Sequence, residues 1–203
     1  MKEYKIPEIT RLDQLNEDSF EYSYSDYMTW QFQERVELIM GKIFPMSAPN
    51  TPHQALSREL TVAFYPYFHR KTCTYFAAPI DVRLPVGKQG NTFKTVVQPD
   101  LCVICDKSKI VTQGIIGAPD LVVEILSPSN RQIEMNEKFE AYQSSLVREY
   151  WIIHPEEEWM LQYVLNENHL FELHKKHENL SRLTSVIFQG LVVDVAVFNP
   201  KGS

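Results

Sequence analysis

The stretch Pro119-Asp-Leu-Val-Val-Glu124-Ile-Leu-Ser-Pro128 places an acidic residue inside a short apolar run that is bounded by prolines. A second run, Val96-Val-Gln-Pro-Asp100-Leu-Cys-Val-Ile104, carries an acidic residue near its beginning. Short apolar runs between Pro and Gly residues are typical of buried strands. A carboxylate on such a strand costs free energy unless it is paired, protonated or bound to a metal. Asp100 and Glu124 therefore predict a small site of oxygen ligands for a hard divalent cation.

The size and composition of the chain predict one globular domain. Its 203 residues are 44% hydrophobic and 23% charged, values that are ordinary for a globular protein with a full core. We expect an arm at residues 1–24, a single domain at 25–198 and a tail at 199–203. Apolar runs stay below the ~18 residues that a membrane span requires, and the first residues do not resemble a signal peptide. We therefore expect a cytoplasmic protein without a membrane partner.

The net charge of −6 argues against a nonspecific nucleic-acid binder, but the charge is unevenly distributed. Residues 1–37 hold 9 acids and 4 bases, and residues 154–203 hold 7 acids and 4 bases. Residues 38–153 hold 10 acids and 12 bases, which gives +2. The segment with the candidate site is mildly basic, so the sequence permits a phosphate-rich substrate without requiring one.

The hydrophobic pattern predicts an α/β (α+β) fold, in which helices flank a mixed β-sheet core. Met40-Gly41 suggests the turn of a β-hairpin at residues 35–46, because Gly supplies positive φ. Thr51 is a candidate N-cap, with Pro52 at the first helical position and Gln54 completing a capping box. Helices are expected at 25–33, from 51 to about 67, and at 132–145. Strands are expected at 75–84, 96–105, 120–126 and, in a strand-rich C-terminal part, at 148–153, 159–165, 169–173, 185–188 and 191–195.

Lys138 lies on the third expected helix, beside an apolar stripe that runs from Met135 to Leu146. At ~100° per residue, its position is roughly 70° from the centre of that stripe. Its stem can therefore lie along apolar surface while the ammonium group reaches the strand ends. A solvated residue at the helix flank is the alternative interpretation.

The three cysteines, Cys73, Cys102 and Cys105, fit reduced core thiols better than a disulfide framework. Cys102 and Cys105 have the spacing of a metal or redox pair. On a strand, however, residues three apart face opposite sides, and Cys73 leaves the set without a fourth ligand.

Several motifs that are spread along the chain point to one family when they are taken together. They are Val36-Glu37 with Gly41, Pro45-Met-Ser-Ala-Pro49, His53-Gln54, Ala78-Pro-Ile-Asp81-Val-Arg-Leu84, Val97-Gln-Pro-Asp100, Gly117-Ala-Pro-Asp-Leu-Val-Val-Glu124-Ile-Leu-Ser-Pro-Ser129, Glu137-Lys138 with Tyr142, and Val147-Arg-Glu-Tyr-Trp-Ile-Ile-His-Pro155. With these motifs the chain resembles the bacterial Uma-type family of restriction endonucleases, a branch of the PD-(D/E)XK superfamily, over about residues 20–198. Leu126 stands where that superfamily has the lysine of its strand triplet, and in the Uma-type branch the lysine has moved to the following helix. Met40 and His154 also depart from the family pattern, which often has Asp there.

The resemblance implies a restriction-endonuclease-like fold and metal-assisted hydrolysis of DNA by a possible homodimer. Asp100, Glu124 and the backbone carbonyl of Ile125 would hold Mg²⁺ or Mn²⁺, which prefer oxygen ligands. Lys138 would position the attacking water or stabilise developing negative charge. Glu37 resembles the additional acid of the family and would complete the metal's outer or second site.

Alternative interpretations stay open for individual residues and for the function. Glu37 could be a surface residue of the hairpin. Gln98 and His53 could contact the substrate, although Gln98 could instead donate to a loop carbonyl and His53 could be a surface residue of a capping turn. Asp81 and Asp120 are expected to be structural. The alternatives to a DNA endonuclease are a catalytically silent nuclease-fold module that binds nucleic acid or another partner, and a hydrolase for a smaller phosphodiester.

Overall fold

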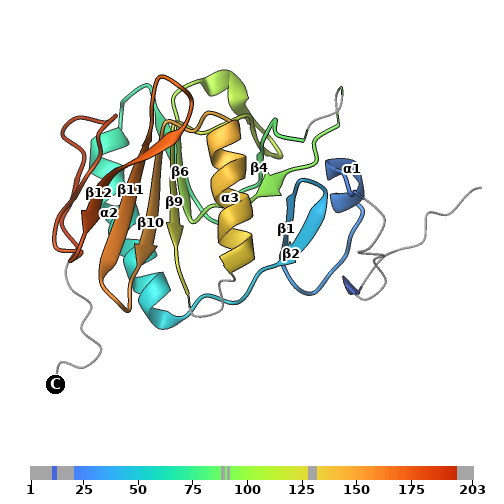
Figure 1. Cartoon of the computed structure of the whole chain (residues 1–203), viewed down its shortest axis with the longest axis horizontal. Helices are drawn as coiled ribbons and strands as arrows, with labels where there is room; N and C mark the ends of the chain where they lie inside the picture. The colour runs from blue at the N-terminus through green and yellow to red at the C-terminus, as the bar shows by residue number, and fades with distance from the viewer. Residues whose placement is uncertain (1–10, 13–20, 88–89, 91, 128–131, 196–203) are drawn as a thin grey trace, which may run out of the picture.

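The computed structural model describes residues 11–12, 21–87, 90, 92–127 and 132–195. Most of the expected arm at 1–24 and the whole tail at 199–203 lie outside these residues. The described part is a mixed α+β fold, as the sequence predicts (Figure 1). None of its helices is long and apolar enough to cross a membrane.

A mixed six-stranded sheet forms the centre of the fold. Its strands at the middle, β9 and β10, run parallel to each other, whereas β9 runs antiparallel to β6. All three are largely buried because helices cover both faces of the sheet. The strand order is β12 (Phe171–His177), β11 (Trp159–Leu165), β10 (Glu149–His154), β9 (Leu121–Ile125), β6 (Leu101–Ile104) and β3 (Thr74–Ala77).

Helices α2 (Thr51–Phe68) and α3 (Gln132–Ser144) cover opposite faces of this sheet (Figure 1). Leu60 and Phe64 of α2 share one core cluster with Val123 of β9. Tyr142 of α3 shares a second cluster with Val122, the neighbouring residue of the same strand. The alternation follows from the two-residue period of a strand, which sends successive side chains to opposite faces.

A second six-stranded sheet packs beside α3. Prolines explain why two of the expected long strands are each divided between the two sheets. The expected strand at 75–84 breaks at Pro79 and the one at 96–105 breaks at Pro99, because proline has no N–H for the strand ladder. The order is β2 (Lys42–Pro45), β1 (Val36–Ile39), β5 (Val96–Val97), β4 (Val82–Arg83), β8 (Gly114–Ile116) and β7 (Ile110–Val111).

The hairpin predicted around Met40-Gly41 is confirmed. Val36 pairs with Pro45 and Ile39 with Lys42, so two residues form the turn. Both turn residues have positive φ, 51° at Met40 and 80° at Gly41. This backbone twist matches the twist of the paired strands, and glycine adopts it without steric cost.

The helix starts differ from the predicted caps. Asn50, not Thr51, caps α2, and its side-chain oxygen accepts a hydrogen bond of 3.0 Å from the backbone N–H of His53. Pro66 lies inside the last turns of α2, which continues to Phe68. The first helix, α1 (Tyr24–Tyr27), is shorter than expected and is capped by Ser23 in a capping box with Asp26.

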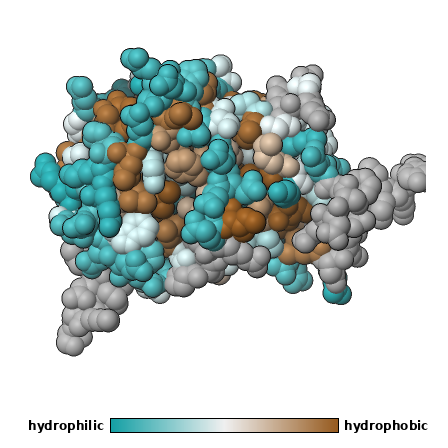
Figure 2. Space-filling view, in the orientation of Figure 1, coloured by the Kyte–Doolittle hydropathy of each residue, from teal (hydrophilic) through white to brown (hydrophobic). Residues whose placement is uncertain are grey.

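The C-terminal strands are confirmed in part. β10, β11 and β12 form where strands are expected, and β12 extends to His177. The strand expected at 191–195 forms in part, as β14 (Val192–Val193), which pairs with β13 (Leu183–Thr184), whereas residues 185–188 do not form the expected strand. Between β6 and β9, the chain forms η2 (Lys107–Lys109) as well as β7 and β8. Figure 2 shows that hydrophobic and hydrophilic residues alternate over the face that carries α3.

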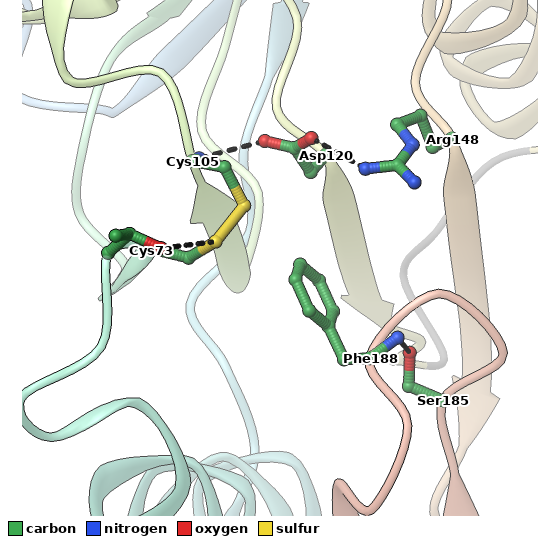
Figure 3. Close-up of a disulfide and its surroundings, with 7 residues drawn as sticks. Cys73, Cys105, Asp120, Arg148, Ser185 and Phe188 are labelled. Atoms are coloured by element: carbon green, nitrogen blue, oxygen red, sulfur yellow. Dashed lines mark hydrogen bonds and ion pairs between the residues drawn. A yellow bond between two sulfur atoms is a disulfide. The ribbon is translucent and has the colours of Figure 1, made fainter.

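The expectation of three reduced thiols is wrong for two of the cysteines. Cys73 and Cys105 form a disulfide between the ends of β3 and β6 (Figure 3). Thr74 pairs with Ile104, so the two cysteines are the next cross-strand neighbours. Strand pairing brings them together across a sequence separation of 32, and the spacing of the cysteines alone does not reveal it. Cys102 is a free, buried thiol, as predicted, and burial raises its pKa to about 12.

Glu149 anchors the C-terminal segment to the central sheet. Its carboxylate is fully buried and accepts hydrogen bonds from the Trp151 indole and the Gln162 amide, each at 2.7 Å. The Ser185 hydroxyl donates to it at 2.7 Å, and the backbone N–H of Ile187 donates at 3.0 Å. These donors satisfy a buried charge that would otherwise be costly.

Replacement of Glu149 by Ala is expected to lower the free energy of unfolding by at least about 3 kcal/mol, because several buried donors lose their acceptor. Urea denaturation measures this loss. Glu172→Ala is the matched control, because Glu172 is an exposed acid on β12 that accepts one hydrogen bond from Asn166. Its effect is expected to stay within about 0.5 kcal/mol. Equal stabilities of the two variants would contradict the anchoring role.

Candidate active site

The antiparallel pairing of β6 and β9 brings the two acids of the opening motif together. Leu101 pairs with Val123, and extension of this register by one residue puts Asp100 opposite Glu124. The side chain of Asp100 accepts a 2.8 Å hydrogen bond from the backbone N–H of Ile125. The beginning of β6 therefore lies beside the end of β9, and both acids lie at the same end of these two neighbouring strands.

Lys138 reaches Glu124 from α3 and also contacts Glu37. Its ammonium nitrogen lies 3.2 and 3.3 Å from the two carboxylate oxygens of Glu124 and 2.8 Å from Oε2 of Glu37. Only 3% of Lys138 is exposed, so the alternative of a solvated helix flank is wrong. The predicted position of the lysine beside the buried face is confirmed.

Helix α3 buries a polar face as well as apolar residues. Its most buried residues include Glu134, Lys138 and Tyr142, which recur every four residues and therefore lie on one side of the helix. Leu146, expected at the end of the apolar stripe, follows the helix and is 45% exposed. Helix α3 thus packs with polar residues toward the acids at the strand ends. The apolar periodicity of the sequence does not predict this burial of polar residues.

Glu37 lies in the middle of β1 and is fully buried, so the alternative of a surface hairpin residue is wrong. Its Oε1 accepts a 2.6 Å hydrogen bond from the backbone N–H of Gln98. Its other oxygen faces Lys138. Glu37 thus connects the second sheet to Lys138 and Glu124. We call Asp100, Glu124, Lys138 and Glu37 the acidic cluster.

His53 lies in the first turn of α2, and it is buried rather than on the surface. Its Nε2 is 3.1 Å from Oδ1 of Asp100. The side chain of Gln98 does not donate to a loop carbonyl. Its amide nitrogen donates to Asp81 at 2.8 Å and to the Tyr27 hydroxyl at 3.1 Å, and its amide oxygen accepts from Arg35.

Asp120 and Asp81 make contacts that agree with the structural roles predicted for them from the sequence. Asp120 precedes β9, accepts a 2.8 Å hydrogen bond from the backbone N–H of Cys105 and pairs with Arg148 at 3.1 Å (Figure 3). It lies at the end of β9 opposite to Glu124. Asp81 accepts hydrogen bonds from Gln98 and Tyr27.

The cluster opens into a cavity of about 250 Å³. Strand ends, the first turns of α2 and the buried face of α3 together form its walls. Its lining combines the acids with serine, glutamine and arginine side chains that can donate hydrogen bonds to phosphate. The polar residues that line it are Arg35, Ser47, His53, Gln54, Ser57, Gln98, Asp100, Glu124, Ser127, Glu134 and Lys138.

Burial and neighbouring charges shift the pKa values of Glu124 and Lys138. Burial raises the pKa of Glu124 from 4.5 to about 8, Lys138 opposes this shift, and the acids Glu37 and Asp100 add to it. Burial by itself would lower the pKa of Lys138, but Glu124 and Glu37 hold it well above its ordinary value. Lys138 is therefore an ammonium ion at neutral pH. Its positive charge is stabilised by the neighbouring acids Glu124 and Glu37.

Comparison with known proteins places this arrangement in a family. A family model described as "Uma2: Putative restriction endonuclease" matches residues 24–196. This chain belongs to the Uma2 family. The match spans both sheets and every residue of the cluster, and it confirms the family that the sequence motifs resemble.

The chain is also similar to individual proteins. The chain is 25% identical over 181 residues to the uncharacterized protein slr1290 of Synechocystis sp., which covers 82% of this chain and 90% of that protein. It is 25% identical over 153 residues to the uncharacterized protein sll1609 of the same organism, covering 68% and 83%. A crystal structure described as a putative nuclease belonging to DUF820 from Anabaena variabilis superposes with a TM-score of 0.65 at 20% identity, covering 87% of this chain and 96% of that one. That likeness establishes a shared fold.

The donor set of this Uma2 chain suits a hard divalent cation. Asp100, Glu124 and Ile125 line one cavity, and two carboxylates with a backbone carbonyl are the oxygen ligands that Mg²⁺ and Mn²⁺ prefer. Among the described residues, no group of three or more His, Cys, Asp or Glu side chains is arranged to hold a metal ion. The carbonyl and water would therefore have to complete the ligand set, and Mg²⁺ commonly retains several waters.

Sequence reasoning missed three residues of this Uma2 site. The Tyr142 hydroxyl donates a 2.6 Å hydrogen bond to Glu124, although the sequence pattern suggests only an apolar residue. Glu134 and Arg35 line the cavity. The spacing of four residues on either side of Lys138 is the signal that could have revealed Glu134 and Tyr142. No sequence signal identifies Arg35, whose position depends on how the hairpin packs.

Proposed function

We propose that this Uma2 chain is a metal-dependent endonuclease that hydrolyses phosphodiester bonds of DNA. The observation that carries the proposal is the contact of the buried ammonium group of Lys138 with Glu124 and Glu37, where Glu124 lies opposite Asp100 and both line one cavity. A structural core has no need of three acids and one lysine, because apolar residues of similar volume would be at least as stabilising. The shared family supports a nuclease.

Asp100, Glu124 and the carbonyl of Ile125 would hold the cation. The chemistry that a bound Mg²⁺ or Mn²⁺ supplies is a lowered pKa of water and neutralisation of charge on the phosphate. Lys138 would orient the attacking water and stabilise the negative charge that develops as the ester oxygen leaves. Glu37 and Tyr142 would keep Lys138 and Glu124 in position through their short contacts. His53 would orient Asp100, and Gln98 would support the wall that faces the substrate.

A catalytically silent module that binds nucleic acid is the second candidate. One observation favours it: Lys138 contacts both Glu37 and Glu124, so it already neutralises part of the negative charge that a cation would use. The two candidates differ in whether a divalent cation binds at Asp100 and Glu124 and whether phosphodiester bonds are broken.

Incubation of the protein with supercoiled, linear and single-stranded DNA tests the proposal. We expect cleavage in Mg²⁺ or Mn²⁺ and none in EDTA, because EDTA removes the cation that would lower the pKa of the attacking water. Calorimetric titration with Mn²⁺ provides a readout that is independent of cleavage. DNA binding without cleavage and without Mn²⁺ binding would instead support the silent module.

A further inference from the structure

A second cavity, of about 270 Å³, lies next to the candidate active site. Two residues, Arg35 and Gln98, line both cavities, so the two are adjacent. We call the second one the aromatic cavity, because aromatic rings supply much of its wall. Its lining residues are Tyr27, Met28, Trp30, Phe32, Glu34, Arg35, Val36 and Gln98.

The aromatic wall is built from interlocked rings. The centroids of Trp30 and Phe32 are 5.2 Å apart with a tilt of 34°. Trp30 also makes edge contacts with Tyr27 at 5.8 Å and with Tyr22 at 5.3 Å. Both Trp30 and Phe32 are half-buried, so neighbours hold the rings while part of each remains accessible. Such a surface is preorganised for stacking against a flat ligand.

Hydrogen bonds attach this wall to the candidate active site. The backbone N–H of Gln98 donates to Glu37, whereas its side-chain amide donates to the Tyr27 hydroxyl at 3.1 Å. The Tyr27 hydroxyl donates in turn to Asp81 at 3.2 Å. Burial raises the pKa of Tyr27 well above its ordinary value, so it remains a neutral donor. One residue, Gln98, thus fixes the aromatic cavity relative to the acids.

The charges in the aromatic cavity favour a nucleobase over a phosphate group. Glu34 lines the cavity and would repel a phosphate, but its carboxylate can accept hydrogen bonds from the N–H groups of a base. Arg35 lies on the boundary between the two cavities, where a phosphate next to the one being cleaved would pass. The combination of stacking rings, an acid within and a cation at the boundary fits a nucleobase attached to a backbone that runs through the candidate active site.

We propose that the aromatic cavity binds an unpaired nucleobase of the substrate strand, adjacent to the phosphate held at Asp100 and Glu124. This inference rests on the proposed function for the identity of the substrate. A base in a duplex is stacked between its neighbours, so the cavity favours single-stranded or locally unpaired DNA over fully paired DNA.

The test compares two ligands with equal charge in EDTA, where cleavage does not occur. One is an oligothymidylate of about twelve nucleotides, and the other is an abasic chain of the same length. Fluorescence anisotropy measures the affinities, and tryptophan quenching that is lost in Trp30→Leu reports stacking on Trp30 rather than on Trp151 or Trp159. We expect the protein to bind the oligothymidylate about tenfold more tightly, with quenching of tryptophan fluorescence by the thymidylate alone.

Variants assign the effect to the aromatic cavity. Trp30→Leu and Phe32→Leu keep an apolar side chain but remove the stacking surface, so the tenfold preference is expected to vanish. Tyr65→Leu is the matched control, since Tyr65 is an exposed aromatic residue that lines neither cavity, and it should preserve the preference. The ligand comparison uses the unmodified protein, so it remains decisive even where a variant fails to fold.

The outcomes separate this inference from the proposed function. Equal affinities of the unmodified protein for the two ligands would overturn the aromatic cavity as a base site, whether or not DNA is cleaved in Mg²⁺. A preference for bases that disappears in Trp30→Leu, together with no cleavage in Mg²⁺ or Mn²⁺, would support the base site and overturn only the nuclease.

Discussion

Asp100→Asn is expected to reduce DNA cleavage by on the order of a thousandfold, because it removes one of the two charged ligands of the proposed cation. The substitution keeps the size of the side chain, and the Asn oxygen can still accept the hydrogen bond from the backbone N–H of Ile125. Loss of activity would therefore report loss of charge rather than loss of folding. Single-turnover cleavage in Mg²⁺ and calorimetric titration with Mn²⁺ measure the two effects separately.

Asp120→Asn is the matched control, because both acids follow a proline and contact a backbone N–H. Asp120 lies at the other end of β9, beside Arg148 and the disulfide (Figure 3). Its replacement should cost some stability and leave cleavage unchanged. If Asp100→Asn cleaves DNA as fast as Asp120→Asn does, Asp100 has no part in catalysis.

Lys138→Met is expected to lower turnover by at least about a hundredfold, because the methionine keeps the apolar stem but cannot stabilise developing negative charge. The same substitution leaves Glu37 and Glu124 buried without their cation. Loss of one partner of a buried ion pair typically costs about 3–5 kcal/mol of folding free energy. Slow turnover alone would therefore be ambiguous, and a second variant is needed.

The double variant Lys138→Met/Glu37→Gln separates the two effects of the lysine. It removes one negative charge together with the positive one, so much of the stability should return while turnover remains low. Thermal denaturation gives the stabilities, and single-turnover cleavage gives the rates. Recovery of turnover in the double variant would assign Lys138 a purely structural role.

The stability deficit of Lys138→Met should also depend on pH. Folding raises the pKa of Glu124 from 4.5 to about 8. The protonated Glu124 side chain therefore contributes stability that is fully present below about pH 4.5 and is lost as the pH rises through about 8. Removal of Lys138 takes away the charge that opposes this shift. The deficit should consequently be larger at about pH 9 than at about pH 6, where a proton can replace the missing cation.

Local sequence patterns predicted the elements that can be recognised from neighbouring residues alone. The two-residue turn at Met40-Gly41 and the apolar run of β9 need no distant partner to be recognised. Elements that depend on distant partners were predicted less well. The strands around Pro79 and Pro99 are divided between two sheets, and the thiols of Cys73 and Cys105 meet only because β3 pairs with β6.

The candidate site shows the same division. Asp100, Glu124 and Lys138 could be named from the sequence, because each stands in a motif that resembles the Uma2 family. The burial of Glu37, the bond from Tyr142 to Glu124 and the contact of His53 with Asp100 could not, because each joins residues from separate elements. A hydrophobic period reports which side of a helix is apolar, but it does not report which charges will be buried against it.

The sequence by itself determined the element types, the family and the three residues proposed for the chemistry. Only the tertiary structure decided that Lys138 lies buried between two acids and that a wall of aromatic rings adjoins them. The physical reason is the range of the interactions concerned. Propensity and periodicity act over a few neighbouring residues. The pairing of buried charges and the stacking of rings depend on contacts between segments that only the folded chain brings together.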